Sequence, residues 1–200
     1  MISCIVLAAG LSQRFLSPKA LAEFNGRTII ERIQEMLIET ALNEIVIVLG
    51  HEQERIKPHL LNHKKIKFVY NKSFNFGQTS SFQSGLKVLS PEALGVFLLP
   101  VDFPVVKKST MDRLISHLNH MGHKNILIPA FQGKKGHPPY FSSSLFEEFH
   151  QLDFSEGINT ISHRHKDQVD LVEVDDPGVL ETFNTREELD VIKGKFTSLK

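Results

Sequence analysis

Three charged side chains in this sequence stand where they could act together on a phosphate. Arg14 and Lys19 lie five positions apart after the first apolar run, and Pro18 disfavours the helical region for the residue before it. We therefore expect an extended loop whose two cations converge on one anion. Asp102 lies between two prolines directly after another apolar run, where a carboxylate can bind Mg²⁺. The alternative is two solvated cations and a carboxylate that only shapes a turn.

The loop that carries the two cations begins with small residues. Residues 1–7 are mostly apolar and uncharged, which is typical of a parallel strand covered on both faces. Leu7 ends this run, and Ala8, Ala9 and Gly10 follow, so that a ligand can approach the backbone and accept hydrogen bonds from its amides. Open α/β sheets bind ligands outside the carboxyl ends of their strands, which is where this loop lies. The pattern indicates a phosphate-binding loop, with an ordinary strand-to-helix turn as the alternative.

A second group of hydrogen-bonding residues opens a predicted helix. Gly77 is followed by Gln78 and then by the hydroxyl residues Thr79, Ser80 and Ser81. Free amides, hydroxyls and the positive end of the helix dipole together favour an anion or ribose site. A plain helix cap is the alternative, and it explains one hydroxyl better than three in succession.

These segments need a frame that brings strand ends together, and the hydrophobic pattern predicts one. Apolar runs at 1–7, 45–49, 66–70, 94–99 and 126–130 alternate with segments of helical spacing at 28–42, 53–61, 80–89 and 109–121. Such alternation implies right-handed crossovers and a mostly parallel twisted sheet flanked by helices, a Rossmann-like α/β fold. After a segment rich in Gly and Pro, the pattern predicts helices at 143–152, 157–165 and 187–192 and a strand at 169–174.

The composition predicts a single domain over residues 1–200. Hydrophobic residues make up 41% of the chain, which is enough for a substantial core. Lys and Arg number 23, as do Asp and Glu, so no global field favours nucleic acid or membrane partners. Cys4 is the only cysteine, which excludes a disulfide within the chain. No apolar stretch approaches the ~20 residues of a membrane span and no signal peptide is apparent, so we expect a cytoplasmic protein.

Several of these segments resemble one family of enzymes. The sequence LAAGLSQRF at 7–15, with the Pro-Lys pair at 18–19, is similar to the signature loop of nucleotidyltransferases of the molybdenum cofactor guanylyl- and cytidylyltransferase type. Further similarity lies in segments 77–86, 98–104, 136–141, 175–180 and 183–189. The resemblance therefore runs from end to end, and it implies a fold of the nucleotide-diphospho-sugar transferase type.

The resemblance also implies roles for individual residues. The residues implied to shape the nucleotide and acceptor pocket are Leu7, Ala8, Ala9, Gly10, Gly77, Thr79, Ser80 and Ser81. Asp102 would hold Mg²⁺ with help from Asn184. Arg14 would neutralise the β- and γ-phosphates, and Lys19 would stabilise charge at the α-phosphate. His137 would contact the phosphate of the acceptor.

Four positions depart from the family pattern. Val101 stands where the family usually has Gly before the metal-binding Asp, a variation that leaves the carboxylate of Asp102 in place. Leu16 stands where the family usually has Gly in its signature loop. Thr182 stands where an acid is common, and Asn184 offers a neutral oxygen where Asp is often found. Because an amide coordinates Mg²⁺ less strongly than a carboxylate, the second metal contact is expected to be weak.

The predicted activity is the transfer of a nucleoside monophosphate unit from an NTP to a phosphorylated acceptor, with release of pyrophosphate. The implied acceptor is molybdopterin or its molybdenum-loaded form. CTP is the expected nucleotide, because cytidylyltransferases of this family carry LAAG and guanylyltransferases LAGG. The methyl group of Ala9 would narrow the base pocket in favour of a pyrimidine.

Two other interpretations stay open. A transferase for a sugar 1-phosphate or another small phosphate would use the same loop and the same Asp102. Alternatively, the chain binds nucleotide or cofactor without catalysis and delivers it to a downstream molybdoenzyme or its chaperone. A dehydrogenase is less expected, because Gly10 does not belong to a G-x-G-x-x-G run opening a helix.

Overall fold

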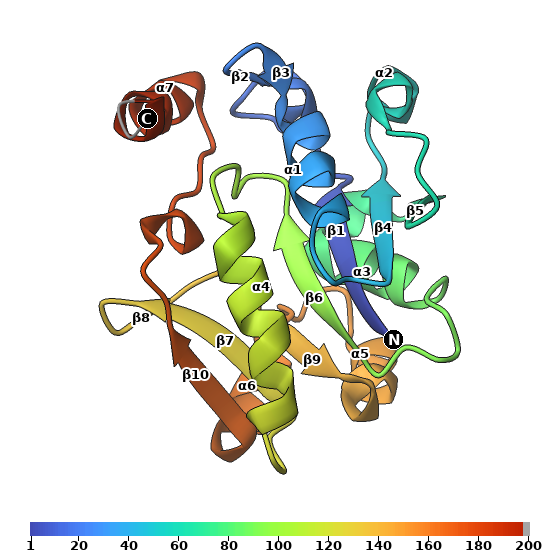
Figure 1. Ribbon diagram of the computed structural model, residues 1–200. Helices are drawn as coiled ribbons and strands as arrows, with labels where there is room; N and C mark the ends of the chain where they lie inside the picture. The colour runs from blue at the N-terminus through green and yellow to red at the C-terminus, as the bar shows by residue number, and fades with distance from the viewer. Residues whose placement is uncertain (198–200) are drawn as a thin grey trace.

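The computed structural model describes residues 1–197, which form an α/β fold around one central sheet (Figure 1). From one edge to the other, its strands are β10 (Val169–Glu173), β7 (Ile126–Phe131), β9 (Tyr140–Ser142), β6 (Gly95–Pro100), β1 (Ile2–Ala8), β4 (Glu44–Leu49) and β5 (Ile66–Tyr70). All of these pairings are parallel except the two made by β9. The short β8 (Lys134–Lys135) pairs antiparallel with β7, and β2 (Glu23–Phe24) and β3 (Arg27–Thr28) form a separate hairpin. The mostly parallel sheet predicted from the sequence is confirmed.

Helices cover both faces of the sheet. In Figure 1, α1 (Ile29–Ile38) and α4 (Lys108–His117) lie in front of it, whereas α3 (Gln78–Leu86), α5 (Phe146–Gln151) and α6 (Asn159–Arg164) lie behind. The short α2 (Gln53–Ile56) follows β4, and α7 (Arg186–Thr197) ends the described chain. The expected α/β layering is thus present.

The central strand β1 supplies both layers of the core. Cys4, Val6 and Ala8 belong to the hydrophobic cluster that contains α1 and α4 side chains, and Ile5 and Leu7 belong to the cluster on the α3 side. Successive strand residues point to opposite faces, so a strand buried on both sides must be apolar throughout. The continuous apolar run at the start of the sequence follows from this position. Burial raises the pKa of the Cys4 thiol well above its ordinary value, so the thiol acts as a small core side chain.

Helix α1 begins where its sequence provides a reciprocal cap. The Thr28 hydroxyl accepts from the backbone N–H of Glu31, and the Glu31 carboxylate accepts from the backbone N–H of Thr28 at 2.9 Å. This capping box satisfies two donors that the first turn would leave unpaired. The hydrogen bond from the Thr28 hydroxyl contributes most to lowering the pKa of Glu31 to about 2, followed by that from His59.

The main difference from the sequence prediction is β9, which lies antiparallel between β6 and β7. The sequence predicted five strands joined by crossovers and, after the Gly- and Pro-rich segment, only the strand at 169–174, which is present as β10. With three residues, β9 is too short to show an alternating pattern. The sequence also predicts a helix at 53–61 that is interrupted near Pro58, and α2 indeed ends at Ile56, where a 3₁₀ turn at Lys57–His59 that contains Pro58 follows.

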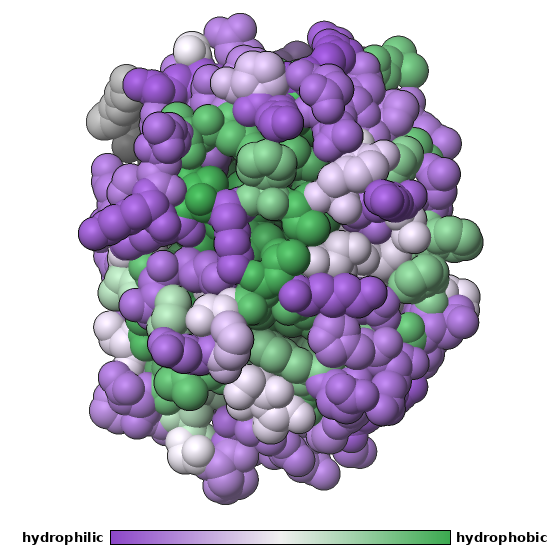
Figure 2. Space-filling view, turned by 90° about the vertical axis from the view of Figure 1, so that its right-hand side faces the viewer, coloured by the Kyte–Doolittle hydropathy of each residue, from purple (hydrophilic) through white to green (hydrophobic). Residues whose placement is uncertain are grey.

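The edge strand β5 is less covered than the centre of the sheet. Phe68 and Tyr70 on this strand are exposed, at 47% and 39%. Figure 2 shows the side of the molecule that carries β5, where hydrophobic residues form a band across the centre and hydrophilic residues surround it. Among residues 1–197 there is no helix with the length and apolar character needed to cross a membrane.

Candidate active site

A cavity of about 480 Å³ lies at the carboxyl ends of β1 and β6, where the sequence places the phosphate-binding loop and Asp102. The predicted site residues that line it are Leu7, Ala8, Ala9, Gly10, Arg14, Lys19, Gly77, Ser81, Asp102 and Asn184. Because β1 and β6 are neighbours in the sheet, the loops that follow them meet at one edge. The fold thus brings together residues that are far apart in the sequence.

Three of these side chains form a connected group. The Lys19 ammonium donates to Oδ2 of Asp102 at 3.1 Å and to Oδ1 of Asn184 at 3.0 Å. The side chains of Lys19 and Asp102 are 14% and 20% exposed, so water screens this ion pair less than a surface pair. The group joins the loop after β1, the loop after β6 and the segment before α7.

Two buried aromatic rings pack next to the group formed by Lys19, Asp102 and Asn184. The Lys19 Nζ lies 5.3 Å from the centroid of the Phe183 ring, and Phe15 packs edge-on against Phe183 at 5.4 Å. Both rings are buried, and the guanidinium of Arg186 lies over Phe15. Phe183 therefore positions its neighbour Asn184 as well as Lys19. The family pattern includes Phe15 but gave no reason to assign Phe183 a part in the site.

The loop between β1 and Lys19 is not extended, which corrects the expectation drawn from Pro18. The Ser12 carbonyl accepts from the backbone N–H groups of Phe15 and Leu16, which closes a turn. The Ser12 hydroxyl then accepts from the backbone N–H of Lys19 at 3.2 Å. Arg14 is carried on this turn, exposed to solvent and lining the cavity. Ser12 is a positioning residue that sequence reasoning missed, since its hydroxyl acts only through the turn.

The backbone at Leu16 explains why the family usually has Gly there. Leu16 has φ of 61°, in the left-handed region, and its side chain is 85% exposed. A residue with a Cβ pays a steric cost in this conformation, and the exposed side chain recovers little by packing. The departure at Leu16 therefore carries backbone strain without breaking the turn.

The hydroxyl residues at the start of α3 divide into two groups. Ser81 lines the cavity, whereas Thr79 and Ser80 do not. The Thr79 hydroxyl donates to the Glu156 carbonyl at 2.5 Å, and the Ser80 hydroxyl donates to the Ser73 carbonyl at 2.8 Å. The sequence gave no signal for Asn71, whose side-chain amide donates to both serine hydroxyls at 3.0 Å. In this structure Thr79 and Ser80 fix the start of α3 and its neighbours, and a nucleotide contact by them remains a prediction.

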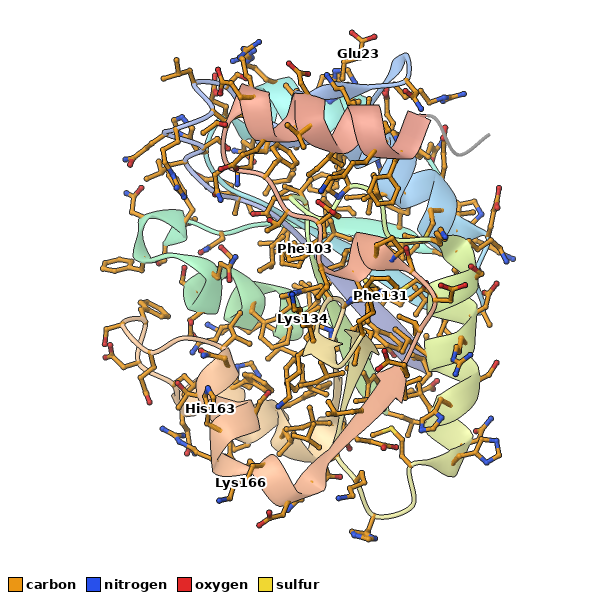
Figure 3. All side chains as sticks on the ribbon, turned by 90° about the vertical axis from the view of Figure 1, so that its left-hand side faces the viewer. Glu23, Phe103, Phe131, Lys134, His163 and Lys166 are labelled. Carbon is orange, nitrogen blue, oxygen red and sulfur yellow. The ribbon has the colours of Figure 1, made fainter. Side chains whose placement is uncertain are left out.

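His137 does not itself line the cavity, although it is close enough to Asp102 to feel the charge of that carboxylate. Its ring stacks on Phe103 with the centroids 4.1 Å apart, and its backbone N–H donates to the Val179 carbonyl. Figure 3 shows Phe103 between α7 and the hairpin that carries Lys134, and Phe103 is partly buried. Burial lowers the pKa of His137 to about 4, although the Asp102 carboxylate acts in the opposite direction. The ring is therefore neutral at pH 7, and its predicted contact with an acceptor phosphate would come from a neutral donor.

The site fits a divalent cation in its charge and its donor atoms. The Lys19 ammonium already places a positive charge between Asp102 and Asn184, and both offer the oxygen ligands that Mg²⁺ and Mn²⁺ prefer. Among residues 1–197 no three His, Cys, Asp or Glu side chains gather closely enough to hold a metal ion. A metal at Asp102 would thus need further ligands from substrate phosphates and water.

Known proteins similar to this chain carry several different names. A relative named probable molybdenum cofactor guanylyltransferase, from Bacillus cereus (strain Q1), is 32% identical over 132 residues, which is 66% of this chain and 62% of that protein. The bifunctional protein GlmU of Prochlorococcus marinus (strain MIT 9211) is 26% identical over 74% of this chain, which spans 33% of the GlmU length. The nicotine blue oxidoreductase of Paenarthrobacter nicotinovorans is 25% identical over 94% of both chains.

Solved structures share the fold. Rv0371c from Mycobacterium tuberculosis H37Rv superposes with a TM-score of 0.84 at 22% identity, covering 96% of this chain and 97% of that one. The same mycobacterial protein has also been solved in complex with manganese, with a TM-score of 0.80. A nucleotidyl transferase from Methanothermobacter has a TM-score of 0.83 at 21% identity and covers 100% of this chain and 99% of that one.

The family assignment rests on a family model that matches most of the chain and not only a single motif. The family model described as the MobA-like NTP transferase domain matches residues 4–169, a stretch that contains Arg14, Lys19 and Asp102. This match confirms the resemblance first seen in the signature loop. The chain belongs to the MobA-like NTP transferase domain family.

Proposed function

We propose that this protein transfers a nucleoside monophosphate unit from an NTP to a phosphorylated acceptor and releases pyrophosphate. The observation that carries the proposal is the convergence of Lys19, Asp102 and Asn184 at the edge of a cavity bounded by the loop after β1. The family match and the nucleotidyl transferase with the same fold support it.

The cavity residues suit an in-line displacement that needs positioning and charge neutralisation. An oxygen of the acceptor phosphate forms a bond to the α-phosphorus, and the bond between that phosphorus and the oxygen bridging to the β-phosphorus breaks. Pyrophosphate leaves with the electron pair. Gly10 exposes backbone to the triphosphate, Arg14 neutralises the β- and γ-phosphates, and Lys19 stabilises charge at the α-phosphate. A divalent metal, for which we propose Mg²⁺ held by Asp102 and Asn184, supplies further positive charge when it is bound.

The geometry implies a change of partner for Lys19 during this reaction. Its ammonium bonds to oxygens of both Asp102 and Asn184, the residues proposed to hold the metal. A metal ion held by these two side chains would compete with Lys19 for them, and Lys19 would then be free to bind the phosphates. In the free protein Lys19 keeps the carboxylate neutralised, which limits the cost of burying its charge.

The signature loop supports CTP as the proposed nucleotide. The relatives named probable molybdenum cofactor guanylyltransferase support molybdopterin as the proposed acceptor, whereas their name favours GTP over CTP. Ala9 lines the cavity, so its methyl group can limit the space for a base. It also packs close to Gly50, where a Cβ atom would come within 2.8 Å of the Ala9 Cβ. This contact keeps open the interpretation that Ala9 is small for packing reasons alone.

The test is pyrophosphate release from CTP or GTP with Mg²⁺ and a panel of acceptors. The panel contains molybdopterin and glucosamine 1-phosphate, the latter because GlmU is among the relatives. We expect release with CTP and molybdopterin. Release with the sugar phosphate alone would support the second transferase interpretation. Nucleotide binding without release from any acceptor would favour the non-catalytic carrier.

The carboxylate gives a sharper test within the same assay. Asp102→Asn keeps the shape of the side chain and removes the charge that holds a metal ion, so metal-dependent release should fall by ~10²-fold or more while the fold persists. Asn184→Asp is the matched converse and should tighten Mn²⁺ binding. Normal turnover by Asp102→Asn would reduce Asp102 to a turn residue.

A further inference from the structure

Two exposed phenylalanines form a pair beside the cavity. Phe76 is 61% exposed and Phe154 is 38% exposed, and their ring centroids are 5.3 Å apart with 35° between the planes. They come from segments distant in the sequence, one leading into α3 and one joining α5 to α6. Burial of the exposed faces of Phe76 and Phe154 by a ligand would therefore contribute favourable hydrophobic free energy.

Hydrogen bonds hold the two segments in place. The Thr79 hydroxyl donates to the Glu156 carbonyl, and the Gln83 side chain donates to the carbonyls of Phe149 and Leu152. Figure 3 shows the loop between α5 and α6 beneath the loop that leads into α3. The aromatic pair is therefore carried on a fixed support, so its rings are preorganised for a ligand.

Two residues next to the aromatic pair can form hydrogen bonds with the edge of a heterocyclic ring. Asn75 and Gln78 flank Phe76 in the sequence, are exposed, and line the cavity. Within the described chain, neither side-chain amide has a hydrogen-bond partner. Each amide offers both a donor and an acceptor, which is the chemistry that recognises the nitrogen and oxygen atoms of a heterocycle.

We propose that Phe76 and Phe154 form a stacking surface for a planar heteroaromatic ring carried by the phosphorylated acceptor, with Asn75 and Gln78 binding the edge of that ring. This proposal rests on the transferase function above and narrows its acceptor to a planar class. Aromatic side chains gain most from flat π-systems, whereas a sugar ring presents hydroxyl groups in several directions. The nucleobase of the NTP is the other planar ring available, and the experiment separates the two.

The experiment measures binding of 6-hydroxymethylpterin by its own fluorescence anisotropy. The sequence contains no Trp and only two Tyr, so the protein contributes little background. The variants are Phe76→Leu and Phe154→Leu, which keep apolar bulk and lose the ring, and Phe76→Tyr, which keeps it. Phe68→Leu on β5 is the matched control, because Phe68 is also exposed but its neighbours in the sequence, unlike those of Phe76, do not line the cavity. CTP binding is measured on every variant by calorimetry.

We expect each Leu variant to raise the Kd for the pterin about tenfold, as loss of one stacking ring does. Phe76→Tyr and Phe68→Leu should bind as the wild type, and CTP affinity should not change. Wild-type pterin affinity in both Leu variants would overturn the proposal. So would an absence of saturable pterin binding in a protein that binds CTP, or a parallel loss of CTP affinity, which would assign the rings to the nucleobase.

These outcomes are independent of turnover. The protein could bind pterin through Phe76 and yet release no pyrophosphate with any acceptor. That result would support the stacking surface and contradict the transferase function. Pyrophosphate release with glucosamine 1-phosphate and no pterin binding would give the opposite result.

Discussion

At the scale of single residues, Lys19 is the side chain that connects the site, because it bonds to both proposed metal ligands. Lys19→Ala leaves Asp102 without a cation, so Mn²⁺ binding in the absence of nucleotide should tighten by about tenfold. Turnover should fall by ~10²-fold, since the charge that acts on the α-phosphate is lost. Electron paramagnetic resonance of free Mn²⁺ measures the first effect and pyrophosphate release the second.

Lys64→Ala provides the control, because Lys64 is exposed and does not line the cavity. It should leave both quantities unchanged. If Lys19→Ala bound Mn²⁺ no better than the wild type, Lys19 and the metal would not compete for the same oxygens.

The proposed preference for CTP over GTP depends on the methyl group of Ala9. Ala9→Gly should move the ratio of kcat/KM for CTP and GTP toward GTP, by no more than the ~1–3 kcal/mol that a methyl group in a pocket supplies. Kinetics with both nucleotides and the same acceptor measure this ratio. An unchanged ratio would mean that Ala9 is small only because it packs against Gly50.

At the scale of elements, the turn after β1 combines strain with function. Leu16→Gly should raise the free energy of unfolding by roughly 1 kcal/mol, because Gly relieves the steric cost of φ at 61° and the exposed Leu16 side chain loses little burial. Urea denaturation followed by circular dichroism measures the change.

Leu94→Gly is the matched control for this prediction, since Leu94 is 63% exposed and is not among the residues with positive φ. There the added freedom of the unfolded chain should lower the free energy of unfolding. Equal effects of the two substitutions would show that the conformation of Leu16 carries no strain.

The same turn shows where sequence reasoning succeeded and where it stopped. The apolar run of β1 and the position of Asp102 after β6 followed from periodicity and strand order, so the place of the cavity could be predicted. The turn at Ser12 could not, because no local pattern marks the bonds of its carbonyl to Phe15 and Leu16 or the bond of its hydroxyl to the backbone of Lys19, seven positions away. The strand β9 also escaped, because its three residues are fixed by partners on β6 and β7 rather than by a local pattern.

At the scale of the whole molecule, stability should depend on pH through His137. Burial lowers its pKa from an ordinary 6.5 to about 4, so the unfolded chain binds a proton that the folded chain does not between these values. The free energy of unfolding should therefore fall as pH drops from 6.5 to 4 and level off above that window. Thermal unfolding scans between pH 4 and 8 measure the effect.

His137→Phe keeps an aromatic ring on Phe103 and removes the titrating group. Its melting temperature should lose part of the dependence on pH in that window. A variant with the full wild-type dependence would assign the acid sensitivity to other groups.

The place of β9 in the sheet also determines the order in which the sheet can assemble while the protein is being synthesised. Strands β1, β4, β5 and β6 are adjacent in the sheet and complete by Pro100, so they can pair while the later chain is still being made. The free edge of β6 then waits for β9 at Tyr140, an interval of roughly two to eight seconds at ordinary translation rates. The loops with Lys19 and Asp102 are made before or at the start of that interval, whereas Phe154 and Asn184 follow it. The ribosome therefore completes the loops that carry Lys19 and Asp102 before the segments that carry Phe154 and Asn184.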